Sequence, residues 1–311
     1  MPGTARAARY TRRRLYGLAL ITALAVVGVA NHKLHWGQKI SSHAAVGQHA
    51  ATPAISLQDY EVVIDAKPIP GAKELSGITY DFDRDRLLAI GNDGPAEVVA
   101  LSRNGEVLDR YRLEGFDDPE GIAYMGNGRV AITNETLQRL DFVDIPAQSG
   151  AIAAKGSPFL TLGLNMHRGN KGFEGLAYDA AGDRVFITKE RDPRQLFEVD
   201  GVAASLGGPL QLALQDHTDW IDRDVSTGDL ADVCFDPKTG HLVLLSEESK
   251  ELVELDADGR FVSSRPLAGR RSGLAHDAPS PEGVAMDTAG NIYIVSEPNL
   301  FYMLRKKSRG A

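Results

Sequence analysis

The stretch "GFEGLAYD" (residues 172–179) has two close copies in the same chain, "DPEGIAY" (118–124) and "SPEGVAMD" (280–287). Each places a glutamate and a glycine before a short apolar run. Two weaker copies, "ELSGITYD" (74–81) and "DLADVCFD" (229–236), complete a series of five. The positions equivalent to the central glutamate recur every 44 to 57 residues, which is too long for helical solenoids and typical of four-stranded blades.

Each copy begins a unit of alternating strands. A second apolar run follows after a short turn, as in "RLLAIGND", "RVFITKE" and "HLVLLSEE". The turns are rich in Gly, Asn and Asp, which tight hairpins need for positive φ. A third run follows in most units, and the fourth strands of units two and three are the least distinct. The dominant period is near two, so the sequence predicts an all-β chain of antiparallel sheets.

The two ends of this region predict how the sheets are joined. The last unit stops after "LFYML" (300–304) without a fourth strand, whereas "YEVVIDAKPI" (60–69) is a strand without a unit. We therefore expect a five-bladed β-propeller of four-stranded antiparallel blades, closed by the N-terminal strand, because ring closure removes exposed sheet edges. The alternative is six blades, with a degenerate blade in 143–172 or 201–228, stretches that look poor in strands.

The N-terminal region is expected to lie outside the fold. Five arginines precede an uncharged, mostly apolar run over residues 15–30, the charge asymmetry of a segment whose N-terminus stays in the cytoplasm. We interpret 1–30 as a signal peptide or membrane anchor, 31–58 as a flexible linker and 59–311 as the propeller domain. An uncleaved anchor in the inner membrane, with the propeller in the periplasm, is favoured because an Ala-x-Ala cleavage pattern is missing. The alternative is a secreted or periplasmic protein after cleavage.

Charge restricts the class of partner. Beyond residue 59 the chain carries 27 basic and 41 acidic residues, and a body this acidic repels a phosphate backbone, so nucleic acid is not an expected partner. The single cysteine, Cys234, permits no intramolecular disulfide and is interpreted as a buried core residue.

The repeated glutamates predict a metal site. The first strand of each propeller blade lines the central channel, so Glu120, Glu174 and Glu282 should converge at one mouth. The first unit without the glutamate offers Glu74, and the other offers Asp229 and Asp232, of which Asp232 is the favoured candidate ligand. Clustered carboxylates require protonation or a cation, and hard oxygen ligands favour Ca²⁺ over Zn²⁺. A purely structural alternative remains open, in which the acids bond backbone amides and the glycine only permits close packing.

Further residues are candidates for the rim of this mouth. Polar pairs end every second strand, among them Asn134 and Glu190, and for these pairs we favour a structural role in binding backbone amides. His167 and His276 precede motif glutamates by seven and six residues. Either could bind a metal or act as a general base.

The motif strings resemble those of the SdiA-regulated (YjiK-like) proteins of bacteria over roughly residues 58–305. The most specific pieces are the five motif copies and the closing "SPEGVAMDTAGNIYIVSEPNLFY". The resemblance implies a five-bladed propeller similar to the NHL type, a bound calcium and an N-terminal membrane segment. It implies no reaction. "EGLAYD" is also similar to propellers described as phytase-like esterases.

Two function classes remain open. The first is a membrane-tethered, calcium-binding module for a small-molecule or protein ligand. The second is a metal-dependent hydrolase of a lactone or phosphoester, with the channel cation polarising the substrate. The sequence has neither a G-x-S-x-G elbow nor an H-E-x-x-H helix that would decide for an enzyme.

Overall fold

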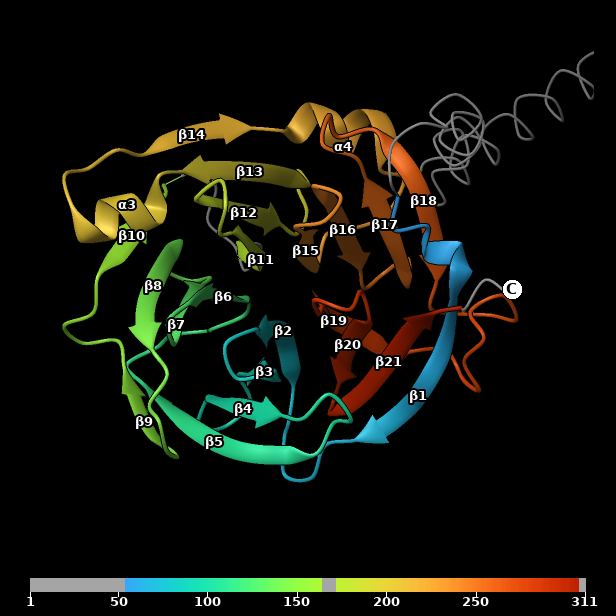
Figure 1. Ribbon diagram of the computed structural model, residues 1–311, viewed down its shortest axis with the longest axis horizontal. Coiled ribbons are helices and arrows are strands. Elements are labelled where there is room, and N and C mark those ends of the chain that lie inside the picture. Colours follow the sequence, from blue (N-terminus) through green and yellow to red (C-terminus); the bar gives the residue numbers. More distant parts are fainter. Residues whose placement is uncertain (1–53, 164–171, 308–311) are drawn as a thin grey trace, which may run out of the picture.

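Five β-sheets surround a central axis (Figure 1). The computed structural model describes residues 54–163 and 172–307. Within these residues each copy of the sequence motif begins the innermost strand of one sheet, and the following strands run outward. The five-bladed propeller is thereby confirmed, and the six-bladed alternative is wrong.

The blades are numbered in the order of their motif copies. Blade one contains β2 (Leu75–Asp81), β3 (Arg86–Gly91), β4 (Glu97–Leu101) and β5 (Val107–Glu114). Blade two contains β6 (Ile122–Gly126), β7 (Arg129–Asn134), β8 (Arg139–Asp144) and β10 (Phe159–Thr161). Blade three contains β11 (Phe173–Asp179), β12 (Arg184–Lys189), β13 (Gln195–Asp200) and β14 (Ala213–Asp216). Blade four contains β15 (Asp232–Asp236), β16 (His241–Ser246), β17 (Glu251–Leu255) and β18 (Phe261–Pro266). Blade five contains β19 (Ser280–Met286), β20 (Ile292–Glu297), β21 (Leu300–Lys306) and β1 (Tyr60–Pro68).

The N-terminal strand closes the ring, as the sequence predicts. Strand β1 pairs antiparallel with β21, from Tyr60 opposite Lys306 to Pro68 opposite Leu300. The first strand of the fold thus becomes the outermost strand of the last blade, and blade five is complete only when both ends of the propeller meet.

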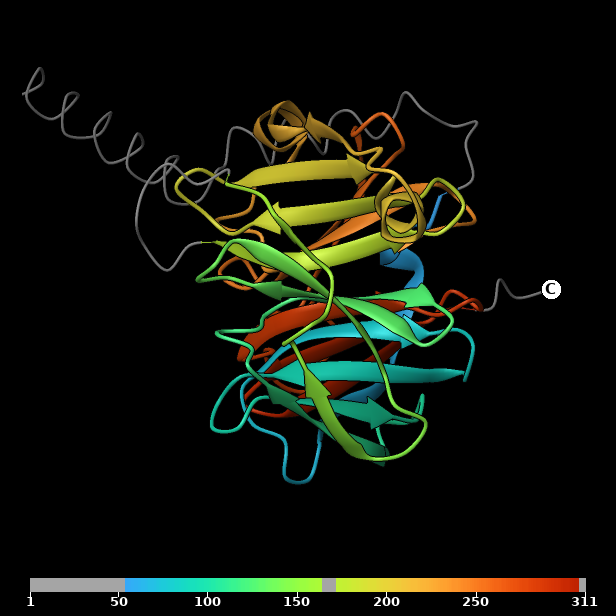
Figure 2. The ribbon, with the colours of Figure 1, turned by 90° about the vertical axis from the view of Figure 1, so that its left-hand side faces the viewer.

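The two stretches that look poor in strands contain short outer elements. Residues 143–172 include β10 and β9 (Gly150–Ala153), and β9 pairs in parallel with β5 as a fifth strand of blade one. Residues 201–228 include β14, α3 (Val202–Gly207) and α4 (Thr218–Asp224). All lie on the outside of the ring (Figure 1, Figure 2). Blade one therefore departs from the expected four-stranded, purely antiparallel pattern.

The hydrophobic core is divided into five clusters, one between each pair of neighbouring blades. Leu87 of β3 packs toward blade five, whereas the next residue, Leu88, packs toward blade two. Middle strands are therefore buried on both faces, which explains why runs such as "RLLAIG" are continuously apolar instead of alternating.

The glycine of the motif is required by close packing at the axis. A Cβ on Gly121 would lie 2.1 Å from the carbonyl oxygen of Glu174 in the next blade, and one on Gly283 would lie 2.8 Å from Gly77. Real Cβ atoms do not approach backbone this closely, so the innermost strands can meet only where a side chain is missing.

The aspartate that ends the motif fixes the turn to the second strand. Oδ1 of Asp179 accepts the Ala181 amide at 3.0 Å, and Oδ1 of Asp287 accepts the Ala289 amide at 2.8 Å. Asp81 and Asp236 bond their turns in the same way. In blade two the equivalent position is Met125, and a glycine with φ +90°, Gly126, follows it.

The packed structure begins before β1. The backbone amides of Ile55 and Ser56 donate to the two carboxylate oxygens of Glu254 at 2.7 and 2.9 Å, and the 3₁₀ helix η1 (Leu57–Asp59) follows. Residues 54–58, expected to belong to the linker, are thus bound to blade four where the structure describes them. The candidate anchor (1–30) and the rest of the linker lie outside the described residues. Within 54–163 and 172–307, no helix is long and apolar enough to cross a membrane.

Replacement of Glu254 should weaken the attachment of Ile55 and Ser56 to blade four. The carboxylate is buried and also accepts the Ser263 hydroxyl, with His241 Nδ1 at 2.8 Å. Glu254→Gln places an amide NH₂ against donors, and we expect it to lower the unfolding free energy by about 2–4 kcal/mol. Urea denaturation measures this loss. Glu114→Gln, an exposed ion-pair change, should cost less than about 1 kcal/mol, and equal losses in the two variants would contradict this account.

The close approach at the axis predicts that Gly121→Ala destabilises the fold severely. We expect a loss of at least about 3 kcal/mol, or no soluble protein, because the backbone of blade three must move. Gly207→Ala is the matched control, since an added Cβ there meets nothing within 4 Å. Thermal unfolding with and without Ca²⁺ should show the same deficit for Gly121→Ala, because the clash is independent of any metal.

Candidate metal centre

A cavity of about 170 Å³ lies at the mouth where the innermost strands begin. Every blade contributes to its wall, and seven of the ten lining residues are acidic. The lining residues are Ser76, Glu120, Glu174, Glu190, Arg191, Asp229, Ala231, Glu247, Glu282 and Glu297. The three predicted glutamates of the Glu-Gly motif therefore share one cavity.

Two of these glutamates have no hydrogen-bond donor in the part of the chain that the structure describes. Within the described residues, the carboxylates of Glu174 and Glu282 accept no hydrogen bond, and the charged groups that act most strongly on them are other acids. Glu120 differs, because it accepts the Asn92 amide at 2.7 Å and a hydrogen bond from Ser76. An acid with only a structural role would be expected to bond backbone amides, and Glu174 and Glu282 do not.

Burial and mutual repulsion disfavour ionisation of this cluster. Desolvation, followed by the charges of Asp118 and Glu135, raises the pKa of Glu120 to about 8. Desolvation, followed by the neighbouring Glu297, likewise raises the pKa of Glu282 to about 8. Desolvation raises the pKa of Glu174 well above its ordinary value as well. Near neutral pH the cavity thus binds protons unless another cation replaces them.

The acids that end the second strands also belong to the cavity. Glu190, Glu247 and Glu297 line it, although the sequence favoured a role for them in binding backbone amides. Burial and the adjacent Glu74 raise the pKa of Glu297 to about 7. Glu190 forms an ion pair with Arg191, which also pairs with Glu248. These second-strand positions point into the mouth, which the strand pattern alone could not show.

A second acidic group adjoins Glu120. One oxygen each of Asp118, Glu120 and Glu135 lie within 4.8 Å of one another. One carboxylate oxygen of Glu135 already accepts a hydrogen bond, from the Gly172 amide at 2.7 Å. Burial raises its pKa to about 7, to which the neighbouring Asp118 contributes. This trio extends the acidic region from the axis toward blades two and three.

Of the two acids that the sequence offers in blade four, Asp229 lines the cavity and the favoured Asp232 does not. Asp232 is not among the lining residues. Its Oδ1 accepts the Val233 amide at 2.8 Å and its Oδ2 accepts the Val284 amide at 2.7 Å. Asp229, three residues earlier, lines the cavity while its carboxylate accepts the Ser246 hydroxyl and the Glu248 amide. Asp232 thus links innermost strands, and Asp229 faces the cavity.

The other candidate residues lie in several places. Glu74 contacts Glu297 at the edge of the cavity. Asn134 is buried and its Oδ1 accepts the Leu137 amide at 3.2 Å. His276 is exposed and does not line the cavity. His167 lies outside the described residues.

The lining chemistry fits a hard cation. Carboxylates are abundant, while no described residue in the wall is a histidine or a cysteine. Such a set of oxygen ligands suits Ca²⁺ and disfavours Zn²⁺. Glu120, Glu174 and Glu282 are the residues that would hold the ion at the axis, because they come from three different blades.

This combination defines a class, a five-bladed propeller with a carboxylate-lined mouth. The sequence profile of the SdiA-regulated family matches residues 52–305, and the chain belongs to that family.

Two solved structures resemble this chain at low sequence identity. A structure described as a luciferin-regenerating enzyme is 10% identical, with a TM-score of 0.51, covering 80% of this chain and 96% of that one. This similarity concerns the fold alone and assigns no function. A chain of a nidogen/laminin complex is 14% identical, with a TM-score of 0.47, covering 72% of this chain and 73% of that one.

The raised pKa values predict that the metal-free protein loses stability as pH rises. Glu120 and Glu282 have an ordinary pKa of 4.5 and a pKa of about 8 in the folded state. The folded state therefore binds more protons than the unfolded state between these values, and the unfolding free energy should fall as pH rises through this window. Urea denaturation in chelator at both ends of the window tests this. The double variant Glu120→Gln/Glu282→Gln should flatten the dependence, whereas Glu114→Gln should preserve it.

Proposed function

We propose that this protein is a calcium-binding propeller whose acidic mouth holds one Ca²⁺ at the axis. The observation that carries the proposal is the pair Glu174 and Glu282, whose carboxylates face other acids without a donor among the described residues. Leaving such groups charged and unpaired costs several kcal/mol. A divalent cation removes that cost, whereas backbone amides already do so for Asp232.

Calcium suits the cavity better than other common cations. Ca²⁺ takes about six to eight oxygen ligands in irregular geometry, while Mg²⁺ demands a near-octahedral shell and keeps its waters. A wall with acids from four blades, in a cavity of about 170 Å³, offers many oxygens at variable positions. The bound ion would join the innermost strands of blades two, three and five, so its binding should stabilise the fold.

We further propose that the propeller is tethered to the inner membrane by its N-terminal segment and faces the periplasm. Support comes from the sequence, in which arginines precede the apolar run at residues 15–30. An acidic, calcium-dependent propeller in this position is suited to act as a binding module for a small-molecule or protein ligand.

One observation favours hydrolysis as the second candidate function. Arg191 lines the same cavity as the acids, and its guanidinium could receive the anionic group of a phosphoester or an opened lactone. Glu297, with a pKa of about 7, has the proton affinity suited to a general base. The chemistry that a Ca²⁺ ion supplies when bound is polarisation of the substrate oxygen.

Calcium titration of the full-length protein, stripped with chelator, tests the proposal. A ligand that binds only the folded state raises the melting temperature, here by roughly 5–10 °C at a hundredfold excess over Kd. Glu174→Gln should reduce the rise to less than about 2 °C, because it removes a ligand. The same substitution should leave the chelated protein at least as stable as the wild type at pH 8, because it removes a repelled charge.

Further outcomes separate the candidates. The control Glu106→Gln changes an exposed acid on the outside of blade one and should preserve the full calcium response. A wild-type melting temperature that responds to none of Ca²⁺, Mg²⁺ and Zn²⁺ would overturn the metal site. Calcium-dependent turnover of lactones or aryl phosphates that disappears in both Glu174→Gln and Arg191→Gln would establish the hydrolase. A calcium response without turnover supports the binding module.

A further inference from the structure

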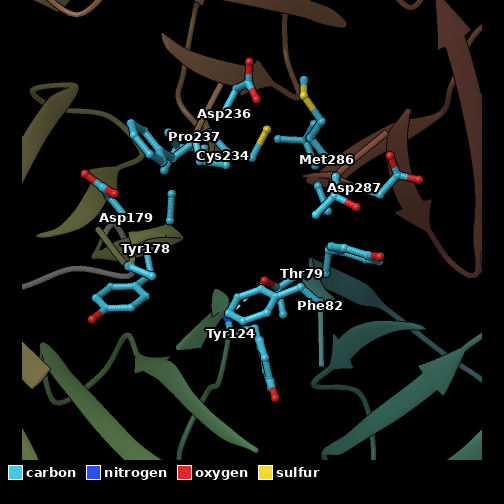
Figure 3. A pocket seen from close by; sticks show the side chains of 18 of the residues that line it. Thr79, Phe82, Tyr124, Tyr178, Asp179, Cys234, Asp236, Pro237, Met286 and Asp287 are labelled. Carbon is cyan, nitrogen blue, oxygen red and sulfur yellow. Dashed lines mark hydrogen bonds between the residues drawn. The ribbon is translucent and has the colours of Figure 1, made fainter. Parts of the chain in front are cut away.

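A second cavity, of about 290 Å³, lies at the opposite mouth, where the innermost strands end (Figure 3). Its character differs from that of the acidic mouth, because apolar side chains form most of the wall. All five blades contribute, and Figure 3 shows their side chains arranged around the opening. Each blade contributes at least one residue to the wall, and these include Phe82, Tyr124, Tyr178, Cys234 and Met286, in the order of the blades.

The aromatic walls are held in place by the fold. The Tyr124 hydroxyl donates to Asp83 at 2.5 Å and accepts the Gly128 amide at 2.9 Å. The Phe82 ring packs edge-on against Tyr124 with ring centroids 5.0 Å apart, yet 45% of Phe82 remains exposed. The cavity is therefore preformed, and its exposed aromatic surface is not used by the fold itself.

The acids at this mouth are already occupied. Asp179 pairs with Arg184 at 2.8 Å, and Asp287 accepts the Tyr293 hydroxyl at 2.8 Å and pairs with Arg103. Asp236 accepts the Lys238 amide and the Thr239 hydroxyl. Because these carboxylates are already bonded to turn amides, hydroxyls and arginines, this mouth is less suited to binding a metal ion than to binding an apolar molecule.

One cation at the rim is available. Lys238 lines the cavity on its exposed side, and its ammonium has no hydrogen-bond or ion-pair partner among residues 54–163 and 172–307. It is the only lysine or arginine in the described wall. An apolar, aromatic interior with one unpaired ammonium at its edge is complementary to a molecule with an apolar body and a single anionic head.

We propose that this cavity binds a small amphipathic carboxylate with an aromatic or compact apolar body. The volume lies at the lower end of the roughly 300–1,000 Å³ of pockets for drug-sized ligands, so the ligand is a small one. Burial of its apolar body against Phe82 and Tyr124 supplies the affinity, and Lys238 selects the anionic head. This site is separate from the acidic mouth and does not depend on the proposed calcium.

Calorimetry of the full-length protein with a matched pair of probes tests the proposal. Naphthalene-2-carboxylate carries the anionic head, and naphthalene-2-carboxamide has the same body without the charge. Ala180→Trp places an indole ring in the cavity from an exposed lining position, and it should weaken the binding of both probes at least about tenfold. Ala213→Trp, on the exposed outermost strand β14 of blade three, is the control and should leave both affinities within about twofold of the wild type.

The head group is tested at Lys238. Lys238→Gln should weaken the binding of the carboxylate about threefold and leave the affinity for the carboxamide unchanged, as expected for the loss of one exposed ion pair. Lys155→Gln, another exposed lysine without a partner in the described part of the chain, should change neither. Equal effects of Lys238→Gln on the two probes would overturn the assignment of an anionic head.

A cysteine placed at an exposed lining position provides an independent localisation. Ala180 is exposed and lines the cavity, and Cys234, the single cysteine of the chain, is buried. In the double variant Cys234→Ala/Ala180→Cys, saturating naphthalene-2-carboxylate should slow the alkylation of the thiol at position 180 by N-ethylmaleimide, followed by intact mass. Binding of the probes that survives Ala180→Trp, or leaves the alkylation rate unchanged, would place the ligand elsewhere and overturn the proposal.

Discussion

The structure depends on how closely five innermost strands can approach one axis. At the position after the motif glutamate, Gly77, Gly121, Gly175 and Gly283 leave no room for a Cβ. The fifth blade position at this layer is Asp232, whose atoms occupy the space beside Gly175 and whose oxygens accept backbone amides from the strands around it. Four absent side chains and one buried carboxylate thus set the radius of the ring. The acids one residue earlier are brought together as a consequence.

The two mouths show how the same residue type serves opposite purposes. At the start of the innermost strands, Glu174 and Glu282 have no hydrogen-bond donor among residues 54–163 and 172–307, and acidic side chains gather in the cavity. At the end of the same strands, Asp179 and Asp287 are bonded to turn amides and paired with arginines. Backbone amides are free at the turn between two hairpin strands but already used within the ladder, so the position along the strand decides whether an acid is neutralised internally.

Much of this arrangement could be predicted from sequence, because the motif repeats at a fixed phase in every blade. The blade number, the closing strand and the convergence of Glu120, Glu174 and Glu282 follow from that phase. Strands β9 and β10 escape prediction, because they are short and mostly exposed, without an alternating pattern. The strand pattern does not show that Glu190 and Glu297 line the cavity. The choice between Asp229 and Asp232 depends on the Val284 amide, which blade five donates to Asp232. A contact between different blades leaves no local signal in the sequence.

The closing strand has a consequence for the order in which the fold is acquired. Strand β1 is the first strand of the propeller to be synthesised, yet its partner β21 ends at Lys306. Residues near the start of the fold must therefore remain unpaired while blades one to four are made, with an exposed strand edge throughout. Contacts of such long sequence separation form slowly because a large loop must close first. The ring can therefore close only after the last blade has been made, and a chain that stops before β21 leaves β1 without its partner.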